Sequence, residues 1–177
     1  VRRDAERRRQ LRHGGIDVLC ANAGVFPQGK LEELSVEQWD DTFAVNLKGC
    51  FLSVQACMPY LKKSSQGRVV LTSSICGTYG CFKNISYSVS KTAMIGLNNI
   101  IALEGQERNV KSNIILPASV TRMAGELDYS TYPPMNDDQV APMVGWLSHE
   151  SCSVSGELYA AIGWRLGGTD GGFGGYQ

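Results

Sequence analysis

Short apolar runs alternate along this chain with longer segments that carry the caps and spaced apolar residues of helices. The runs are rich in Val, Ile and Leu, as is typical of strands buried on both faces of a parallel sheet. The expected strands are 16–20, 67–72, 111–116 and 158–162, and the expected helices are 35–60, 87–105 and 136–146. This alternation predicts βαβ units and therefore an α/β fold with a parallel sheet.

Polar residues and prolines mark several of these boundaries. Ser35 and Gln38 have the spacing of a capping box, so a helix should begin there. Asn136 and Gln139 form a second plausible cap pair. Pro117 should stop the third strand, because proline has no N–H to donate to a sheet. The irregular stretch 118–134 that follows is more typical of a lid or binding loop than of a simple connection.

Ser74, Tyr87 and Lys91 are the strongest candidates for chemistry. Tyr87 and Lys91 lie four residues apart on an expected helix, which brings their side chains to one face and within reach of each other. A nearby ammonium favours the phenolate, so we expect a lowered tyrosine pKa and proton transfer near neutral pH. The preceding strand should deliver Ser74 to the same space. The alternative is a surface Tyr–Lys pair without a catalytic role.

A second Tyr-x-x-x-Lys spacing runs from Tyr79 to Lys83. Gly77 and Gly80 flank or interrupt it, so no stable helix is expected and the two side chains need not meet. The Tyr87 copy opens a long apolar run that can form a buried helix, and it is preferred.

Two other features carry weaker signals. Asn46 lies in the middle of an expected helix and is followed closely by Gly49, a combination that is unfavourable there. Such an Asn either faces solvent or has a function, and the residues alone favour solvent. Asn22, Ala23 and Gly24 follow the first strand, where small residues let a ligand approach closely, although an ordinary turn also explains them.

Length, charge and cysteines narrow the possible functions. The 177 residues suit one domain, the formal net charge is zero, and no apolar run could span a bilayer, so we expect neither nucleic acid nor a membrane as partner. The arginines near the start alternate with acidic residues and indicate a solvated helix face. The six cysteines lack metal-ligand spacing, which favours reduced thiols in a cytoplasmic protein without a metal site.

Taken in order, Asn22-Ala23-Gly24, Asn46, Ser74, Tyr87 with Lys91, and Pro117 with Thr121 resemble the pattern of the short-chain dehydrogenase/reductase family. Ser74 lies thirteen positions before Tyr87, as that pattern requires. The resemblance covers roughly residues 5 to 163. It implies a Rossmann-like, doubly wound parallel sheet and a nicotinamide-dependent oxidoreductase that acts on a small alcohol or carbonyl substrate.

The resemblance also implies a role for each residue. Tyr87 would be the general acid/base, Lys91 would lower its pKa and hold the nicotinamide ribose, and Ser74 would orient the substrate oxygen. Asn46 would hold a water that connects Lys91 to solvent. The site of the cofactor, NAD or NADP, would be lined by Asn22, Ala23, Gly24, Pro117 and Thr121, together with Tyr87 and Lys91.

Two regions refine the resemblance. Residues 117–123, with Ala118 where most members have Gly, and residues 140–151 look more like the (3R)-hydroxyacyl-CoA dehydrogenase domains of peroxisomal multifunctional enzymes and their bacterial relatives. A 3-hydroxyacyl thioester is therefore a reasonable substrate, and a hydroxysteroid is the alternative.

The family's first βαβ portion, with its glycine-rich phosphate turn, does not precede Val1. We therefore expect a truncated domain over 1–163, a flexible Gly-rich tail over 164–177, and weak dinucleotide binding by this polypeptide alone. Two functions stay open: the catalytic part of a dehydrogenase, or a non-catalytic remnant that serves as an interaction module. In either case the family resemblance implies a homo-oligomer, a dimer or tetramer.

Overall fold

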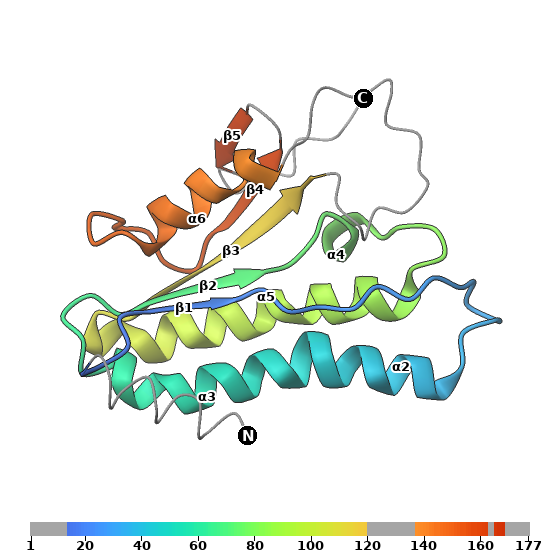
Figure 1. The fold of residues 1–177 in the computed structure, drawn as a ribbon, viewed down its shortest axis with the longest axis horizontal. Coiled ribbons are helices and arrows are strands. Elements are labelled where there is room, and N and C mark those ends of the chain that lie inside the picture. Colours follow the sequence, from blue (N-terminus) through green and yellow to red (C-terminus); the bar gives the residue numbers. More distant parts are fainter. Residues whose placement is uncertain (1–13, 120–136, 163–164, 169–177) are drawn as a thin grey trace.

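The computed structural model describes residues 14–119, 137–162 and 165–168, the last four by their backbone. Within these ranges the chain forms one five-stranded sheet (Figure 1). Its strands stand in the order β1 (Val18–Ala21), β2 (Arg68–Thr72), β3 (Lys111–Ala118), β4 (Leu158–Ile162) and β5 (Arg165–Gly168). The first four strands are parallel, and β5 is antiparallel to β4. The expected α/β architecture with a Rossmann-like, doubly wound parallel sheet is confirmed.

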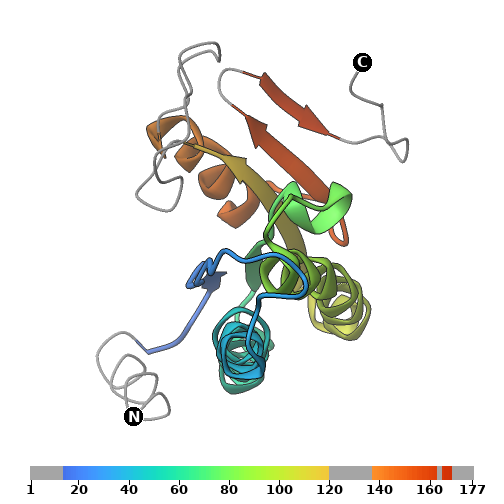
Figure 2. The same cartoon turned by 90° about the vertical axis from the view of Figure 1, so that its right-hand side faces the viewer.

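Helices cover both faces of the sheet (Figures 1 and 2). The helical elements are α2 (Val36–Phe43), a π-helical turn (Ala44–Lys48), α3 (Gly49–Leu61), α4 (Cys76–Tyr79), α5 (Ile85–Gly105), two 3₁₀ turns (Gln106–Arg108 and Asp137–Gln139) and α6 (Ala141–Ser148). Helices α3 and α5 pack on β1, β2 and β3 from one side, and α6 packs on β2 and β3 from the other. The sheet is therefore the middle layer of three.

Alternation along the central strands divides the core in two. On β2, Leu71 joins the cluster beneath α3 and α5, whereas its neighbour Val70 joins the cluster beneath α6. On β3, Ile114 belongs to the first cluster and Ile115 to the second. Because successive side chains of a strand point to opposite faces, a strand buried on both faces must be apolar throughout. This is why the strands are mostly apolar, with the buried polar residues Arg68, Ser112 and Asn113 at their starts.

Most predicted boundaries hold within a few residues. The capping box is present, since the Ser35 side chain accepts from the Gln38 N–H and the Gln38 side chain accepts from the Ser35 N–H. The second Tyr-x-x-x-Lys spacing, from Tyr79 to Lys83, does not lie on one helix, because α4 ends at Tyr79 and Lys83 has a φ of 63°. The predicted cap residue Asn136 and most of the predicted loop 118–134 lie outside the described residues.

The prediction that Pro117 stops the third strand is wrong, because β3 continues to Ala118. In the register of the sheet, Ile115 is the last β3 residue paired with β2, and Pro117 pairs with Ala161 of β4. The backbone polar groups of residues 115 and 117 both face β2, because alternate residues of a strand bond to the same neighbour. At Pro117, however, β2 has already ended, so no strand partner lies there. The missing N–H therefore costs no sheet hydrogen bond.

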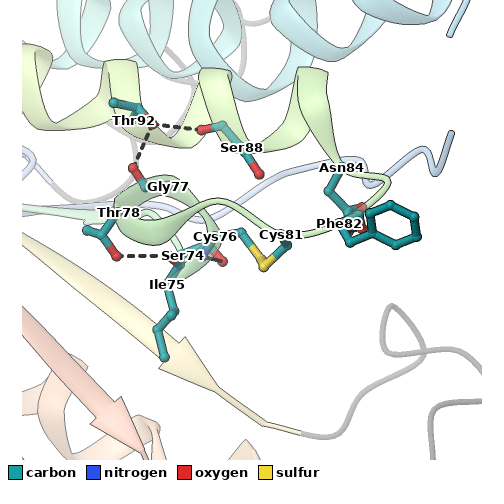
Figure 3. The surroundings of a disulfide bond; sticks show 10 residues. All are labelled: Ser74, Ile75, Cys76, Gly77, Thr78, Cys81, Phe82, Asn84, Ser88 and Thr92. Carbon is teal, nitrogen blue, oxygen red and sulfur yellow. Dashed lines mark hydrogen bonds between the residues drawn. A yellow bond between two sulfur atoms is a disulfide. The ribbon is translucent and has the colours of Figure 1, made fainter. Parts of the chain in front are cut away.

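The expectation that all six cysteines are reduced thiols is also wrong. Cys76 and Cys81 form a disulfide, with their Cα atoms 5.0 Å apart (Figure 3). Gly80 between them has a φ of 75°, which turns the chain back on itself and brings Cys81 to the start of α4. Sequence spacing alone does not show that turn.

The predicted flexible tail over 164–177 begins differently from expectation. Residues Arg165–Gly168 form β5 and extend the sheet beyond β4. The rest of that segment lies outside the described residues, as does the basic stretch before residue 14.

Candidate active site

A cavity of about 590 Å³ opens where the parallel strands end. The carboxyl ends of parallel strands meet at one edge of a sheet, and ligands of open α/β sheets bind outside that edge. The cavity walls come from the loops after β1, β2 and β3, from α5 and from α6. Among the residues that line it are Asn22, Gly24, Phe26, Thr72, Ser74, Cys76, Tyr87, Lys91 and Pro117.

Helix α5 supplies the two central side chains. Tyr87 and Lys91 are both buried, at 9% and 3% exposure, and the Lys91 Nζ lies 5.6 Å from the centroid of the Tyr87 ring. The Lys91 Nζ donates a hydrogen bond of 2.7 Å to the Thr72 carbonyl oxygen. The four-residue spacing thus places both groups on one face of a helix, as predicted, and that face turns toward the end of β2.

The segment after β2 brings Ser74 to the same cavity. Ser73 is buried and its Oγ donates to the Lys91 carbonyl oxygen at 2.7 Å, which fixes the end of β2 against α5. The next side chain, Ser74, lines the same cavity as Tyr87 and is close enough to affect the pKa of its phenol. Ser74, Tyr87 and Lys91 therefore share one space.

Burial dominates the electrostatics of this group. It raises the pKa of Tyr87 above its ordinary value, and the hydrogen bond from Ser74 opposes the shift. Burial also lowers the pKa of Lys91 to about 8, with a smaller opposing effect from Cys50. The expected lowering of the tyrosine pKa is therefore wrong for the described residues. The cause is desolvation of a phenol that Phe26 covers edge-on, with ring centroids 4.6 Å apart.

Asn46 lies behind the cavity and does not face solvent. It is 1% exposed and sits in the π-helical turn between α2 and α3. Its Oδ1 accepts from the Val25 N–H at 2.8 Å, and its Nδ2 donates to the Val25 carbonyl oxygen and to the Ser90 Oγ. Asn46 thus ties the loop after β1 to α5. The solvent-facing interpretation of this residue is wrong.

The loop after β1 fits a ligand that must come close to Lys91. A Cβ atom at Gly24 would lie 3.3 Å from the Asn46 Oδ1 and 3.6 Å from the Lys91 Nζ, so the loop passes close to both side chains and glycine leaves the most room there. The cavity combines apolar walls with a few converging polar groups, as ligand sites commonly do. These residues fit the nicotinamide and ribose portion of a dinucleotide, because they place polar groups, including the Lys91 ammonium, in an otherwise apolar cavity.

The other predicted residues divide into three groups. Asn22 and Pro117 line the cavity together with Gly24. Ala23 is exposed and is not among the lining residues. Thr121 lies outside the described residues.

Sequence reasoning missed Phe26 and Cys76. Phe26 contacts the Tyr87 ring from the loop after β1, sixty-one positions earlier in the chain. Cys76 lines the cavity beside Ser74. The only available signal was position, since both residues closely follow predicted strand ends that carry candidate site residues.

The described residues also show whether a metal site or a membrane-spanning helix is present among them. In the described part of the chain, no group of three or more His, Cys, Asp or Glu side chains could hold a metal ion. The helices described there are also too short or too polar to cross a bilayer.

Comparison with known proteins gives consistent matches. A family model for short chain dehydrogenases matches residues 3–130. The peroxisomal multifunctional enzyme type 2 of Drosophila melanogaster is 39% identical over 153 residues, which are 85% of this chain and 26% of that protein. The mouse protein of the same name is 37% identical over 153 residues, 85% of this chain and 21% of the relative. The chain thus spans about a quarter of the length of these relatives.

A solved structure agrees with the sequence matches. The full-length Drosophila melanogaster peroxisomal multifunctional enzyme type 2 superposes with a TM-score of 0.78 and 31% identity, covering 94% of this chain and 29% of the other. The fold, the strand-end cavity and a family match over more than half of its length show that this chain belongs to the short-chain dehydrogenase family.

Proposed function

We propose that the chain carries the catalytic site of an NAD- or NADP-dependent oxidoreductase that interconverts an alcohol and a carbonyl compound. The observation that carries this proposal is the convergence of Ser74, Tyr87 and Lys91 on one strand-end cavity. The nicotinamide cofactor, when bound, accepts or supplies the hydride. The chain's own residues have to orient the substrate and move one proton.

Tyr87 is the proposed acid/base group. Its raised pKa keeps the phenol protonated at neutral pH, which suits donation of the Oη proton to a carbonyl oxygen. When the reaction runs from alcohol to carbonyl, the phenol must first lose its proton, and the resulting phenolate oxygen accepts the proton of the alcohol. Ser74, which lines the same cavity as Tyr87, orients the substrate oxygen toward it.

Lys91 has two proposed tasks. Its Nζ is held toward the cavity by the Thr72 carbonyl oxygen, in reach of a ribose hydroxyl. Its positive charge near the Tyr87 ring also favours the phenolate, which assists proton removal from an alcohol. A pKa of about 8 leaves Lys91 largely charged at neutral pH.

Asn46 acts differently from the first expectation. Its side chain is hydrogen-bonded to Val25 and Ser90, so its proposed role is to hold the loop after β1 in position. That loop includes Asn22 and Gly24, which line the proposed cofactor side of the cavity. The water relay implied by the family resemblance stays a prediction for the Asn46 backbone and side chain.

A 3-hydroxyacyl thioester is the proposed substrate class. The support is the likeness to two proteins named as peroxisomal multifunctional enzymes, together with the residues 140–151 already noted. The choice between NAD and NADP is left to the assay below.

The location and assembly of the chain stay predictions. A cytoplasmic location was expected, whereas the matched relatives are named as peroxisomal proteins. A homo-oligomer is supported by exposed apolar side chains on the outer helices, namely Phe51 and Leu52 on α3 and Ile100 and Leu103 on α5. The alternative of a non-catalytic interaction module gains no support, because the matched relatives are named as enzymes.

The test is a hydride-transfer assay on the full chain. A short 3-oxoacyl-CoA and a 3-oxosteroid would each be offered with NADH and with NADPH, and the loss of reduced nicotinamide would be followed by absorbance. We expect turnover of the thioester with one of the two cofactors when that cofactor is supplied in large excess, because weak dinucleotide binding is predicted for this chain. Turnover of the steroid alone would overturn the substrate class, and no turnover in any combination would overturn the proposed activity.

A further inference from the structure

The Cys76–Cys81 disulfide closes a small loop directly beside the proposed active site. Cys76 is the first residue of α4, and Cys81 follows the Gly80 turn, so the bond joins the two ends of the segment 76–81 (Figure 3). Both cysteines are partly exposed. A small reductant or oxidant can therefore reach the bond in the folded protein.

One end of this bond is tied to the proposed catalytic serine. The Cys76 N–H donates to the Ser74 Oγ at 3.2 Å, and Cys76 is itself part of the cavity wall. At the other end, the Asn84 N–H donates to the Cys81 carbonyl oxygen, one residue before α5 begins at Ile85. The bond thus links the loop that carries Ser74 to the segment that leads into the helix of Tyr87.

The segment between the two cysteines has weak local support without the bond. Helix α4 is a single turn of four residues, and isolated helices of that length are not stable in water. Tyr79 and Phe82 expose 55% and 80% of their surface, so they bury little apolar area. Figure 3 shows the Phe82 side chain directed away from the disulfide. The firm contacts lie on either side of this exposed stretch: the Gly77 carbonyl oxygen accepts from the Thr92 Oγ1 at 2.6 Å, and the Lys83 carbonyl oxygen accepts from the Gly29 N–H at 2.9 Å.

The other described cysteines remain thiols, so the disulfide is specific to Cys76 and Cys81. Cys20 is an exposed free thiol, and Cys152 is a buried one. In a reducing compartment, disulfides that do form are commonly transient and redox-sensing. A sequence separation of five closes a short loop, and cross-links of short loops restrain the unfolded chain least. Breaking this bond should therefore change the structure mainly within the loop that it closes.

We propose that Cys76 and Cys81 are a reversible redox modification site that controls how well the Ser74 loop is ordered; its effect on catalysis rests on the proposed function. A dithiol reductant supplies two electrons and two protons, the S–S bond breaks, each cysteine becomes a thiol, and the dithiol closes to its own disulfide. The segment 79–82, between the contacts at Gly77 and Lys83, then loosens, and the Cys76 N–H holds the Ser74 Oγ less firmly.

The first arm of the test measures the loop without using activity. The full chain would be incubated with dithiothreitol or with its oxidised cyclic form, and alkylation followed by mass spectrometry would count the thiols. Hydrogen–deuterium exchange of peptides across 74–84 would then be compared between the two states. We expect exchange to become several-fold faster on reduction. Equal exchange in two states that differ by the two thiols would overturn the proposal.

The second arm uses variants and activity. The Cys76→Ala/Cys81→Ala double variant should show fast exchange across 74–84 in both states. Cys20→Ser, which removes a free thiol outside the loop, should keep the wild-type difference in exchange between the two states. Reduction of the wild-type chain should raise KM for the carbonyl substrate several-fold. An unchanged KM would overturn the catalytic consequence. A chain that is inactive in both states contradicts the proposed function, and the exchange data then decide the redox site by themselves.

Discussion

At the scale of single residues, burial decides the chemistry of the site. Tyr87 and Lys91 are almost fully enclosed, and desolvation disfavours the charged form of each group. The pKa of the phenol is therefore raised and that of the amine is lowered to about 8. A four-residue spacing predicts that the two groups meet, but it does not reveal how much water they lose, because Phe26 arrives from a distant loop.

The lowered pKa of Lys91 predicts a specific dependence of stability on pH. Between about pH 8 and the ordinary value of 10.5, the unfolded chain keeps a lysine proton that the folded chain has lost. Raising the pH through this window therefore stabilises the fold, with a slope that approaches about 1.4 kcal/mol per pH unit. The raised pKa of Tyr87 acts in the opposite direction above pH 10.

Urea unfolding of the wild-type chain and of Lys91→Met at several pH values up to about 10 would check this. The difference in unfolding free energy between the two proteins should change steadily in favour of the wild type as pH rises. Lys62→Met, at an exposed position, is the matched control and should keep the wild-type slope. A Lys91→Met protein with the wild-type slope would contradict the assignment.

At the scale of elements, the site depends on the close approach of α4 to α5. A Cβ atom at Gly77 would lie 2.8 Å from the Lys91 carbonyl carbon and 2.9 Å from the Thr92 nitrogen. Real Cβ atoms do not come so close to backbone, so α4 or α5 would have to move. Glycine at this position lets the segment after Ser74 lie directly against the turn of α5 that carries Lys91.

Gly77→Ala should therefore destabilise the chain by about 1–3 kcal/mol and displace Ser74 from Tyr87. Denaturant unfolding and the hydride-transfer assay would measure the two effects. Gly96→Ala is the control, because Gly96 lies exposed within α5 with nothing within 4 Å of a Cβ atom. That variant should be neutral or stabilising, since alanine favours a helix more than glycine does. Equal stability of the two variants would argue against the close packing.

At the scale of the whole molecule, Arg68 connects the parts. It is 2% exposed on β2, and its guanidinium donates to the carbonyl oxygens of Gly67, Asn109, His149, Glu150 and Cys152. These oxygens come from the loops before β2, before β3 and after α6. One side chain thus satisfies buried backbone groups from three distant segments, at the end of the sheet opposite the cavity.

Arg68→Met should keep most of the apolar volume and leave several of these carbonyl oxygens without a donor. Each unsatisfied buried group costs about 1–3 kcal/mol, so the loss should exceed that of any surface substitution. Thermal or urea unfolding would measure it. Arg108→Met, at an exposed position, should change stability by less than about 0.5 kcal/mol. A stable Arg68→Met protein would show that solvent or rearranged loops can replace the guanidinium.

The difference between short-range signals and contacts of distant segments explains how much of the fold and the site can be predicted from the sequence. The four parallel strands, the main helices and the meeting of Ser74, Tyr87 and Lys91 follow from local periodicity and spacing, because those signals are short-range, whereas β5 is not predicted. Arg68, Phe26 and the buried bonds of Asn46 act between segments far apart in the chain, and no local pattern contains them. The Cys76–Cys81 bond depends on a turn at Gly80 that its residue type permits but does not dictate.

The central claim is that the Tyr87 phenol transfers the proton, whereas the other residues of the site bind the substrate and the cofactor. The most direct test compares kcat and the cofactor Kd of the full chain with those of Tyr87→Phe, with Tyr79→Phe as the control at the exposed second copy. The account predicts that Tyr87→Phe loses about 10²–10⁴-fold in kcat with an unchanged cofactor Kd, while Tyr79→Phe keeps both values. A Tyr87→Phe protein with wild-type kcat would contradict it.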